Sequence, residues 1–275
     1  MTTQQPAWVL SRKAYGDNGL LVEFFTADWG RCGAVVKGAH RKKRGGSFAT
    51  LLQPFQPLLV SLIGKGELKH LRQAEAPSAG ALLKGESLMS GLYLNELLSR
   101  VLPRFDVMPL VFVEYSRAIE QLHSAPPEAA LRRFELVLLS EMGYRINLLT
   151  DEHGESIRPL VHYRFEVERG FCVSDERLLT PRPNVMTGEQ IHRTTRWLEE
   201  GAQLQEADAA ALKQITRVAL SRLTAGRRLH TRELVRDLRS HQRPSVWGGK
   251  QYRERTPRVQ VAQRNGRCGS VVLWR

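Results

Sequence analysis

Five cations lie within eight residues near the N-terminus, at Lys37 and throughout residues 41–44, which read Arg-Lys-Lys-Arg. Four consecutive charges cannot be buried without partners, so residues 41–44 must lie on a solvated loop between two elements. A cationic loop on a rigid scaffold suits a phosphate backbone, because neutralised phosphates release their condensed counterions. Taken alone, the run fits a solubilising surface loop equally well, so the rest of the chain decides between the two.

The charge of the whole chain is positive and uneven, with a formal net charge of +13 over 275 residues. Residues 1–80 carry 11 Lys and Arg against 5 Asp and Glu, and residues 222–275 carry 14 against 3. Residues 81–221 are mildly acidic, with 16 against 20. Two basic ends predict a polyanionic partner, with nucleic acid as the default. A membrane surface is disfavoured, because the basic regions lack the apolar helical face of interfacial binding.

The three cysteines are far apart and form no CxxC pair, which fits a reducing compartment and gives no zinc spacing. No apolar run of membrane-spanning length and no secretory signal are present. We therefore expect a cytoplasmic, nucleoid-associated protein without a metal. His153, His162 and Cys172 are an alternative metal-ligand set, but their spacing matches no common zinc pattern.

Five short apolar segments between residues 7 and 76 predict strands, and no helical period runs through them. They are AWVL, LLVEFFT, CGAVVKG, PFQPLLVSLIG and ELKHLRQAE, separated by turns rich in Gly and Asp. Five strands in this space predict a small closed barrel of the oligonucleotide/oligosaccharide-binding (OB) type. Such a barrel displays its loops, so residues 41–44 become an exposed arm.

Beyond residue 80 the apolar period becomes helical. Ser87 is the expected N-cap of the first helix, and Pro109 and Pro127 each suit a first helical turn. Gly143 is the expected stop of the helix that begins at Pro127. Further helices are expected from Thr187, from about residue 208 to 223, and from residue 231 to about 239.

Residues 150–180 interrupt the helical pattern, and YRFEVERGFCV predicts a hairpin that turns at Arg169 and Gly170. The chain is therefore predicted to have an α+β fold. An OB-fold β-barrel in residues 1–80 precedes an all-helical domain in residues 81–242, which carries the small β insertion. Residues 243–275 are expected to form a basic, flexible tail whose aromatic residues can stack on bases.

No enzyme signature is present, since the chain lacks GxxxxGK[ST], GxSxG and HExxH patterns. Glu96 and Glu135 lie within predicted helices and are expected to form salt bridges rather than to transfer protons. We expect no catalytic activity and no cofactor. A metal-dependent nuclease, the enzymatic alternative, would need clustered carboxylates that the basic regions lack.

The order of motifs along the chain resembles the bacterial recombination mediator family RecO over about residues 7–240. The motifs are FFT…GR at 24–31, VVKGAHRKKR at 35–44, LLQPFQPLLV at 51–60, AEA at 74–76, SGLYLNELLSRVL at 90–102 and LRRFELVLLSEMGY at 131–144. The resemblance implies an N-terminal OB barrel and a helical domain. Some members have a zinc-binding insertion, but its cysteines are absent here.

The resemblance also implies a function. Members bind single- and double-stranded DNA, anneal complementary strands, and act with RecR to help RecA replace single-stranded-DNA-binding protein (SSB). The expected DNA contacts on this chain are the cations Arg31, Lys37, Arg41, Lys42, Lys43, Arg44, Lys65, Lys69 and Arg72. The acidic C-terminal tail of SSB docks on the family's helical domain, which assigns that contact to Arg132 and, more weakly, to Arg133.

Two alternatives stay open at this stage. Arg132 and Arg133 also fit ordinary exposed helix arginines beside Glu128 and Glu135, rather than a carboxylate grip next to an apolar groove. For the whole chain, the alternative is an OB-fold RNA-binding protein of translation or RNA metabolism, which charge alone does not exclude.

Overall fold

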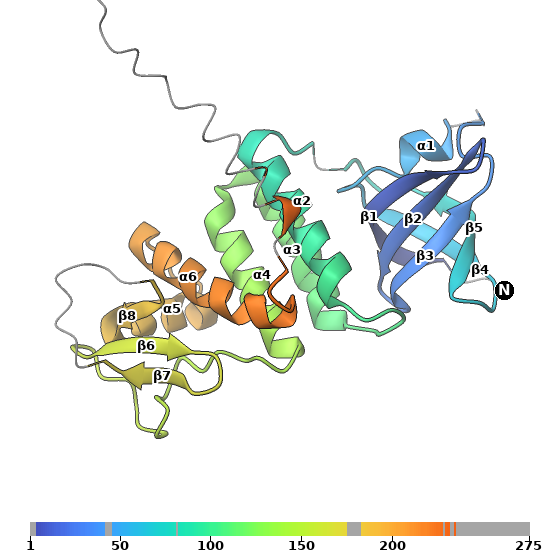
Figure 1. The fold of residues 1–275 in the computed structure, drawn as a ribbon. Coiled ribbons are helices and arrows are strands. Elements are labelled where there is room, and N and C mark those ends of the chain that lie inside the picture. The colour runs from blue at the N-terminus through green and yellow to red at the C-terminus, as the bar shows by residue number, and fades with distance from the viewer. Residues whose placement is uncertain are drawn as a thin grey trace, which may run out of the picture.

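The structure is a computed structural model that describes residues 4–41, 46–80, 82–174, 183–227, 229–231 and 234. Lys42, Lys43 and Arg44, the end of the helix predicted at 231–239, and the tail 243–275 lie outside these residues. A closed β-barrel lies at one end of the molecule, a small sheet with two helices lies at the other, and three further helices lie between them (Figure 1). The predicted α+β architecture is confirmed.

The five predicted strands are all present in the barrel. They are β1 (Gln5–Tyr15), β2 (Gly19–Thr26), β3 (Gly30–Val36), β4 (Leu58–Ile63) and β5 (Leu68–Glu75), and the short helix α1 (Phe48–Leu51) lies between β3 and β4. The strands close in the order β1-β2-β3-β5-β4. Every neighbouring pair is antiparallel except β3 and β5, which run parallel.

Alternation along the strands gives the barrel two apolar surfaces. Val22 and Phe24 of β2 and Ala34 of β3 are among the residues that fill the interior. The alternate residues of these strands, including Trp8 on β1 and Phe25 on β2, lie on the outer face of the barrel and belong to the core of the helical part. One outer side of the barrel, at β1 and β2, is therefore covered by the helices.

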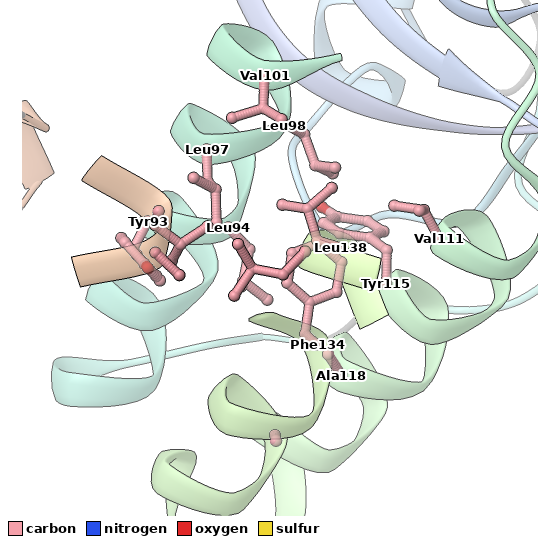
Figure 2. Packing of buried hydrophobic residues seen from close by; sticks show 14 of the residues in the cluster. Tyr93, Leu94, Leu97, Leu98, Val101, Val111, Tyr115, Ala118, Phe134 and Leu138 are labelled. Atoms are coloured by element: carbon pink, nitrogen blue, oxygen red, sulfur yellow. The ribbon is translucent and has the colours of Figure 1, made fainter. Parts of the chain in front are cut away.

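The helical part contains five helices within the described residues: α2 (Gly85–Val101), α3 (Pro109–Ser124), α4 (Pro127–Glu141), α5 (Gly188–Glu200) and α6 (Glu206–Leu223). Figure 2 shows how α2, α3 and α4 meet, with Leu94 and Leu98 facing Tyr115, Phe134 and Leu138. No helix among the described residues combines the length and the apolarity needed to cross a bilayer.

Most predicted helix boundaries are confirmed. Pro109 and Pro127 occupy first turns, and Gly143, with a φ of +82°, follows the end of α4. The prediction of Ser87 as an N-cap is wrong, because α2 begins at Gly85 and Lys84 is its N-cap. Gly85 has a φ of +52°, a conformation that glycine adopts without cost, so the chain turns into the helix before Ser87.

The predicted hairpin is confirmed, and it has a third strand. The strands β6 (His162–Glu166), β7 (Gly170–Val173) and β8 (Val185–Thr187) form a sheet in the order β7-β6-β8. The sheet thus extends past the predicted limit of residue 180. At its end, Thr187 and Gln190 form the predicted capping box, which starts α5 directly from β8.

A β-bulge fixes the barrel to the helices. The pairing of β1 with β2 shifts register between Val9 and Ser11, which releases two carbonyls from regular pairing. The buried amide of Asn95 on α2 donates to the carbonyls of Val9 (3.3 Å) and Leu10 (3.0 Å). Its oxygen accepts from the Tyr115 hydroxyl at 2.5 Å, so a buried hydrogen-bond network joins β1 to α2 and α3.

Gly30 is where the α2–α3 connection approaches the barrel most closely. Gly30 has a φ of +63°, and a Cβ there would lie 1.8 Å from the Asp106 carbonyl oxygen. We expect Gly30→Ala to lower the free energy of unfolding by about 2–3 kcal/mol, measured by urea denaturation. Gly16→Ala is the matched control, because Gly16 has a φ of +59° in open space. Equal losses in the two variants would contradict the close approach.

Candidate nucleic-acid interface

The segment between β3 and α1, residues 37–46, is called the cationic arm. Backbone hydrogen bonds hold the residues near its two ends. The backbone N–H of Ala39 donates to the Asn18 carbonyl, and that of Ala49 donates to the Ala39 carbonyl, each at 2.9 Å. Ala39 itself is buried in the barrel core. Lys37 and Arg41, the cations of the arm that the structure describes, are both exposed.

Hydrogen bonds also hold the C-terminal side of the arm, where α1 begins. Ser47 and Thr50 form a capping box that starts α1. From β1, the guanidinium of Arg12 donates to the Ala49 carbonyl at 2.7 Å. The described residues on either side of positions 42–45 are therefore fixed by hydrogen bonds to neighbouring elements, while Lys42, Lys43 and Arg44 themselves lie outside the described residues.

A second row of basic side chains lies along β5 and in the turn before it. Lys65 lies in the exposed β4–β5 turn, and the side chains of His70 and Arg72 are exposed on the strand. The parallel register pairs Val35 with His70, which brings Lys37 and Arg72, each two residues further on, to the same level. The arm and Arg72 thus lie toward the end of β3, whereas Lys65, in the turn before β5, lies toward the start of β3.

Two of the predicted contact residues are engaged within the protein. The Arg31 guanidinium donates to Glu23 at 2.6 Å and to the Leu102 carbonyl at 2.7 Å, and its side chain is only 14% exposed. Lys69 donates to the Gly64 carbonyl at 3.0 Å. Arg31 therefore joins the barrel to the end of α2, and this role leaves it few donors for a phosphate.

Two further exposed cations were not among the contacts predicted from the sequence. Lys13 is exposed on β1, and the Arg104 side chain is 47% exposed, with its Nη2 3.6 Å from Glu23. Arg104 lies in the α2–α3 connection, which Pro103 and Pro109 delimit. Such a pair of prolines between helical segments is the signal that could have identified an exposed loop.

The two arginines assigned to the SSB tail differ sharply in exposure. Arg132 is 4% exposed and forms a two-bond ion pair with Glu135, so the alternative of two exposed arginines is wrong for this residue. Arg133 lies with its Nε 3.0 Å from Glu114, and 32% of its side chain is exposed. The Nη1 of Arg133 also donates to the Leu198 carbonyl at 3.4 Å, so both guanidinium groups have partners within the protein, and of the two residues only Arg133 has a partly exposed side chain.

The described cysteines have no reactive character. Burial raises the pKa of the Cys32 thiol to about 11, despite a hydrogen bond from Thr26 that opposes the shift. Burial, reinforced by Glu152, raises the pKa of Cys172 to about 11 as well. Within the described residues, no three His, Cys, Asp or Glu side chains group as a metal site requires, so His153, His162 and Cys172 do not form one.

Glu96 on α2 holds the start of the C-terminal basic segment. Its carboxylate accepts from the backbone N–H groups of His230 (2.8 Å) and Thr231 (2.9 Å) and from the Thr231 hydroxyl, and it pairs with Arg100. Burial acts to raise the Glu96 pKa, but these hydrogen bonds and Arg100 outweigh it and lower the pKa. Glu96 and Glu135 both form the salt bridges predicted for them.

A lowered carboxyl pKa gives stability that is present above the pKa of the unfolded chain and is lost as the pH falls through the folded one. We expect Glu96→Ala to lower the free energy of unfolding by about 1 kcal/mol at pH 7, and this difference to vanish as the pH falls below about 4. Glu199→Ala removes an exposed carboxylate of α5 and serves as the control. A difference that grows in acid would contradict this role.

A closed five-stranded barrel of the OB type that exposes Lys37, Arg41 and Arg72 and is joined to a helical domain is typical of nucleic-acid-binding proteins. Comparison with known families agrees. The family model "Recombination protein O N terminal" matches residues 1–78, and "Recombination protein O C terminal" matches residues 83–233. The chain belongs to the RecO family of DNA repair proteins, which sets aside an RNA-binding protein of translation.

Individual relatives cover most of the chain. The DNA repair protein RecO of Alkalilimnicola ehrlichii is 40% identical over 235 residues, which span 85% of this chain and 91% of that protein. Those of Vibrio atlanticus and Halorhodospira halophila are 39% and 36% identical, over 84% and 86% of this chain and 92% and 97% of theirs. The matches therefore extend across both the barrel and the helical domain.

Proposed function

We propose that this protein is a recombination mediator that binds single- and double-stranded DNA, anneals complementary strands, and acts with RecR to load RecA onto SSB-coated strands. The observation that carries the proposal is the cationic arm, held at Asn18 and Ala49 on a barrel whose adjoining β5 side is also basic. Family membership supplies the DNA repair setting.

The proposed mechanism needs no bond to be made or broken. Two DNA strands repel each other through their phosphates, and cations that lie on both strands reduce this repulsion while the bases pair. The buried hydrogen-bonded junction between the barrel and the helices favours such a role, since it helps to hold two bound strands in one orientation. Residues 222–275, which Glu96 contacts at His230 and Thr231, add further positive charge to the protein.

For the SSB tail, the proposal assigns docking to the outer surface of α4. Arg133 is the arginine proposed to donate to a peptide carboxylate, because part of its side chain is exposed while its Nε faces Glu114 and its Nη1 faces the Leu198 carbonyl. Arg132 remains in the proposal as the residue that fixes the orientation of α4 from inside.

The test is annealing of two complementary DNA strands, either naked or coated with SSB. The intact protein should accelerate annealing on both, and Arg133→Ala should slow only the reaction on coated strands. A competition between RNA and DNA oligonucleotides of one sequence should favour DNA. Failure of the intact protein to anneal naked strands would overturn the proposal, whereas equal losses for Arg133→Ala on both substrates would overturn only the assignment of the SSB tail.

A further inference from the structure

The α2–α3 connection places an aromatic residue on the surface in an unfavourable backbone conformation. Phe105 has a φ of +57°, which costs a residue with a side chain about 1–2 kcal/mol relative to the ordinary regions. Its backbone N–H donates to the Arg31 carbonyl at 3.0 Å, and the close approach of Asp106 to Gly30 holds the connection against β3. The position of Phe105 is therefore fixed by the barrel.

The ring of Phe105 does not enter a core. Phe105 is 36% exposed and belongs to neither of the two apolar clusters. Its contact is with a cation, because the ammonium of Lys69 lies 5.0 Å from the centroid of the Phe105 ring and 5.3 Å from that of Trp29. Packing of a core thus gives no reason for an aromatic residue at this place. The exposed part of the Phe105 ring is open to a contact with a molecule outside the chain, which would give such a reason.

The surroundings of the two rings have the character of a single-strand binding site. Leu68 is an exposed apolar neighbour in the strand that carries Lys69, and it pairs with Gly33 of β3. Arg104, next to Phe105, reaches β3, since its Nη1 lies 3.3 Å from where a Cβ on Gly33 would be. One cation thus lies over two aromatic rings and the residue next to Phe105 carries a second, a combination that suits a backbone phosphate beside a stacked base.

We propose that Phe105, with Trp29 and Lys69, forms a stacking site for one unpaired nucleobase at the junction of the barrel and the helices. The base lies on the exposed part of the Phe105 ring, and Arg104 contacts an adjoining phosphate. A duplex cannot supply this base without unstacking it, so the site favours single strands, whereas the cationic arm serves both DNA forms. This inference rests on the DNA-binding function proposed above and adds how single strands are distinguished.

Phe105→Leu and Phe105→Tyr test the site, with binding to a thymidine oligonucleotide and to a duplex of the same charge measured by fluorescence anisotropy. We expect Phe105→Leu to weaken single-strand binding about tenfold with an unchanged salt dependence and unchanged duplex binding. Phe105→Tyr, which keeps a ring, should bind as the unsubstituted protein does. Thermal unfolding of each variant shows whether it is folded.

A measurement on the unsubstituted protein makes the result independent of folding. An oligonucleotide that is abasic throughout keeps every phosphate but has no base to stack, and the protein should bind it about tenfold more weakly than the thymidine strand. Equal affinity for the two would overturn the stacking site, as would a Phe105→Leu variant that loses both DNA forms equally or neither. If the unsubstituted protein binds no DNA, the proposed function itself fails, which is a distinct result.

Discussion

Neutralising the cationic arm in the variant R41Q/K42Q/K43Q/R44Q is expected to weaken binding to single-stranded DNA by about two to three orders of magnitude near 0.1 M salt. The expectation follows from counterion release, because each phosphate contact on a single strand adds about 0.7 to the slope of log K against log salt concentration. Four lost contacts flatten that slope by about 3. No other surface change of this size should have a comparable effect.

The fold should tolerate this change. The hydrogen bonds that fix the arm come from backbone groups of Ala39 and Ala49 and from Arg12, and none of the substituted side chains is needed for them. Arg41 is exposed, and surface substitutions away from such anchors change stability by about 0.5 kcal/mol or less. A loss of DNA affinity without a change in the unfolding midpoint therefore reports on contact with the phosphates.

The matched control removes the same number of charges from the helical domain. In the variant R158Q/R164Q/R196Q/R217Q the four substituted arginines are all exposed. Affinities are measured by fluorescence anisotropy between about 50 and 200 mM salt. The control should lose much less affinity than the arm variant. Equal losses and equal slopes would mean that net charge, rather than the arm, governs binding.

The barrel was predictable because its signals are local. Strand β2, with the sequence GLLVEFFT, alternates between the interior and the exterior, and turn residues bracket it, so its length and pairing follow from neighbours in the sequence. The solvation of residues 41–44 follows from the cost of burying charge. The same holds for the capping box at Thr187 and for the glycine after α4, which are features of a few consecutive residues.

The roles of single cations were not predictable, because they depend on what packs against them. Arg31 looks like any strand arginine until Leu102, far along the chain, reaches its guanidinium. Arg132 lies next to the predicted apolar stripe of α4 and was expected outside. Since α4 packs on α2, α3 and α6, more than one stripe is buried, and Arg132 and Glu135 fall inside. Phe105 was missed because a loop between two helices has no period to interpret.

The second large effect is expected at Glu135, which is 1% exposed and lies at the centre of a buried polar network. Its carboxylate accepts from the Tyr93 hydroxyl at 2.6 Å, from the Thr216 hydroxyl at 2.5 Å and from Arg132 at 3.0 Å. Glu135→Ala leaves the Arg132 guanidinium buried without a counter-charge. We expect a loss of about 3–5 kcal/mol in the free energy of unfolding, measured in urea.

The double variant Arg132→Met/Glu135→Leu separates the charge from the packing. Apolar side chains of similar volume remove both charges together, so the double variant should be more stable than Glu135→Ala and close to the unsubstituted protein. Control substitutions of Glu128, an exposed carboxylate in the first turn of α4, should have little effect. A double variant as unstable as Glu135→Ala would show that the hydroxyls of Tyr93 and Thr216, left without their acceptor, carry the cost instead.

The same double variant decides what Arg132 does for an acidic peptide. If Arg132 only fixes α4, the folded double variant should bind the C-terminal peptide of SSB as tightly as the unsubstituted protein does, while Arg133→Ala binds it weakly. If Arg132 contacts the peptide itself, the guanidinium must leave Glu135 and Thr216, and binding must offset the cost of that separation. Loss of peptide binding in a folded double variant would therefore return the contact to Arg132 and require a rearrangement of α4 on binding.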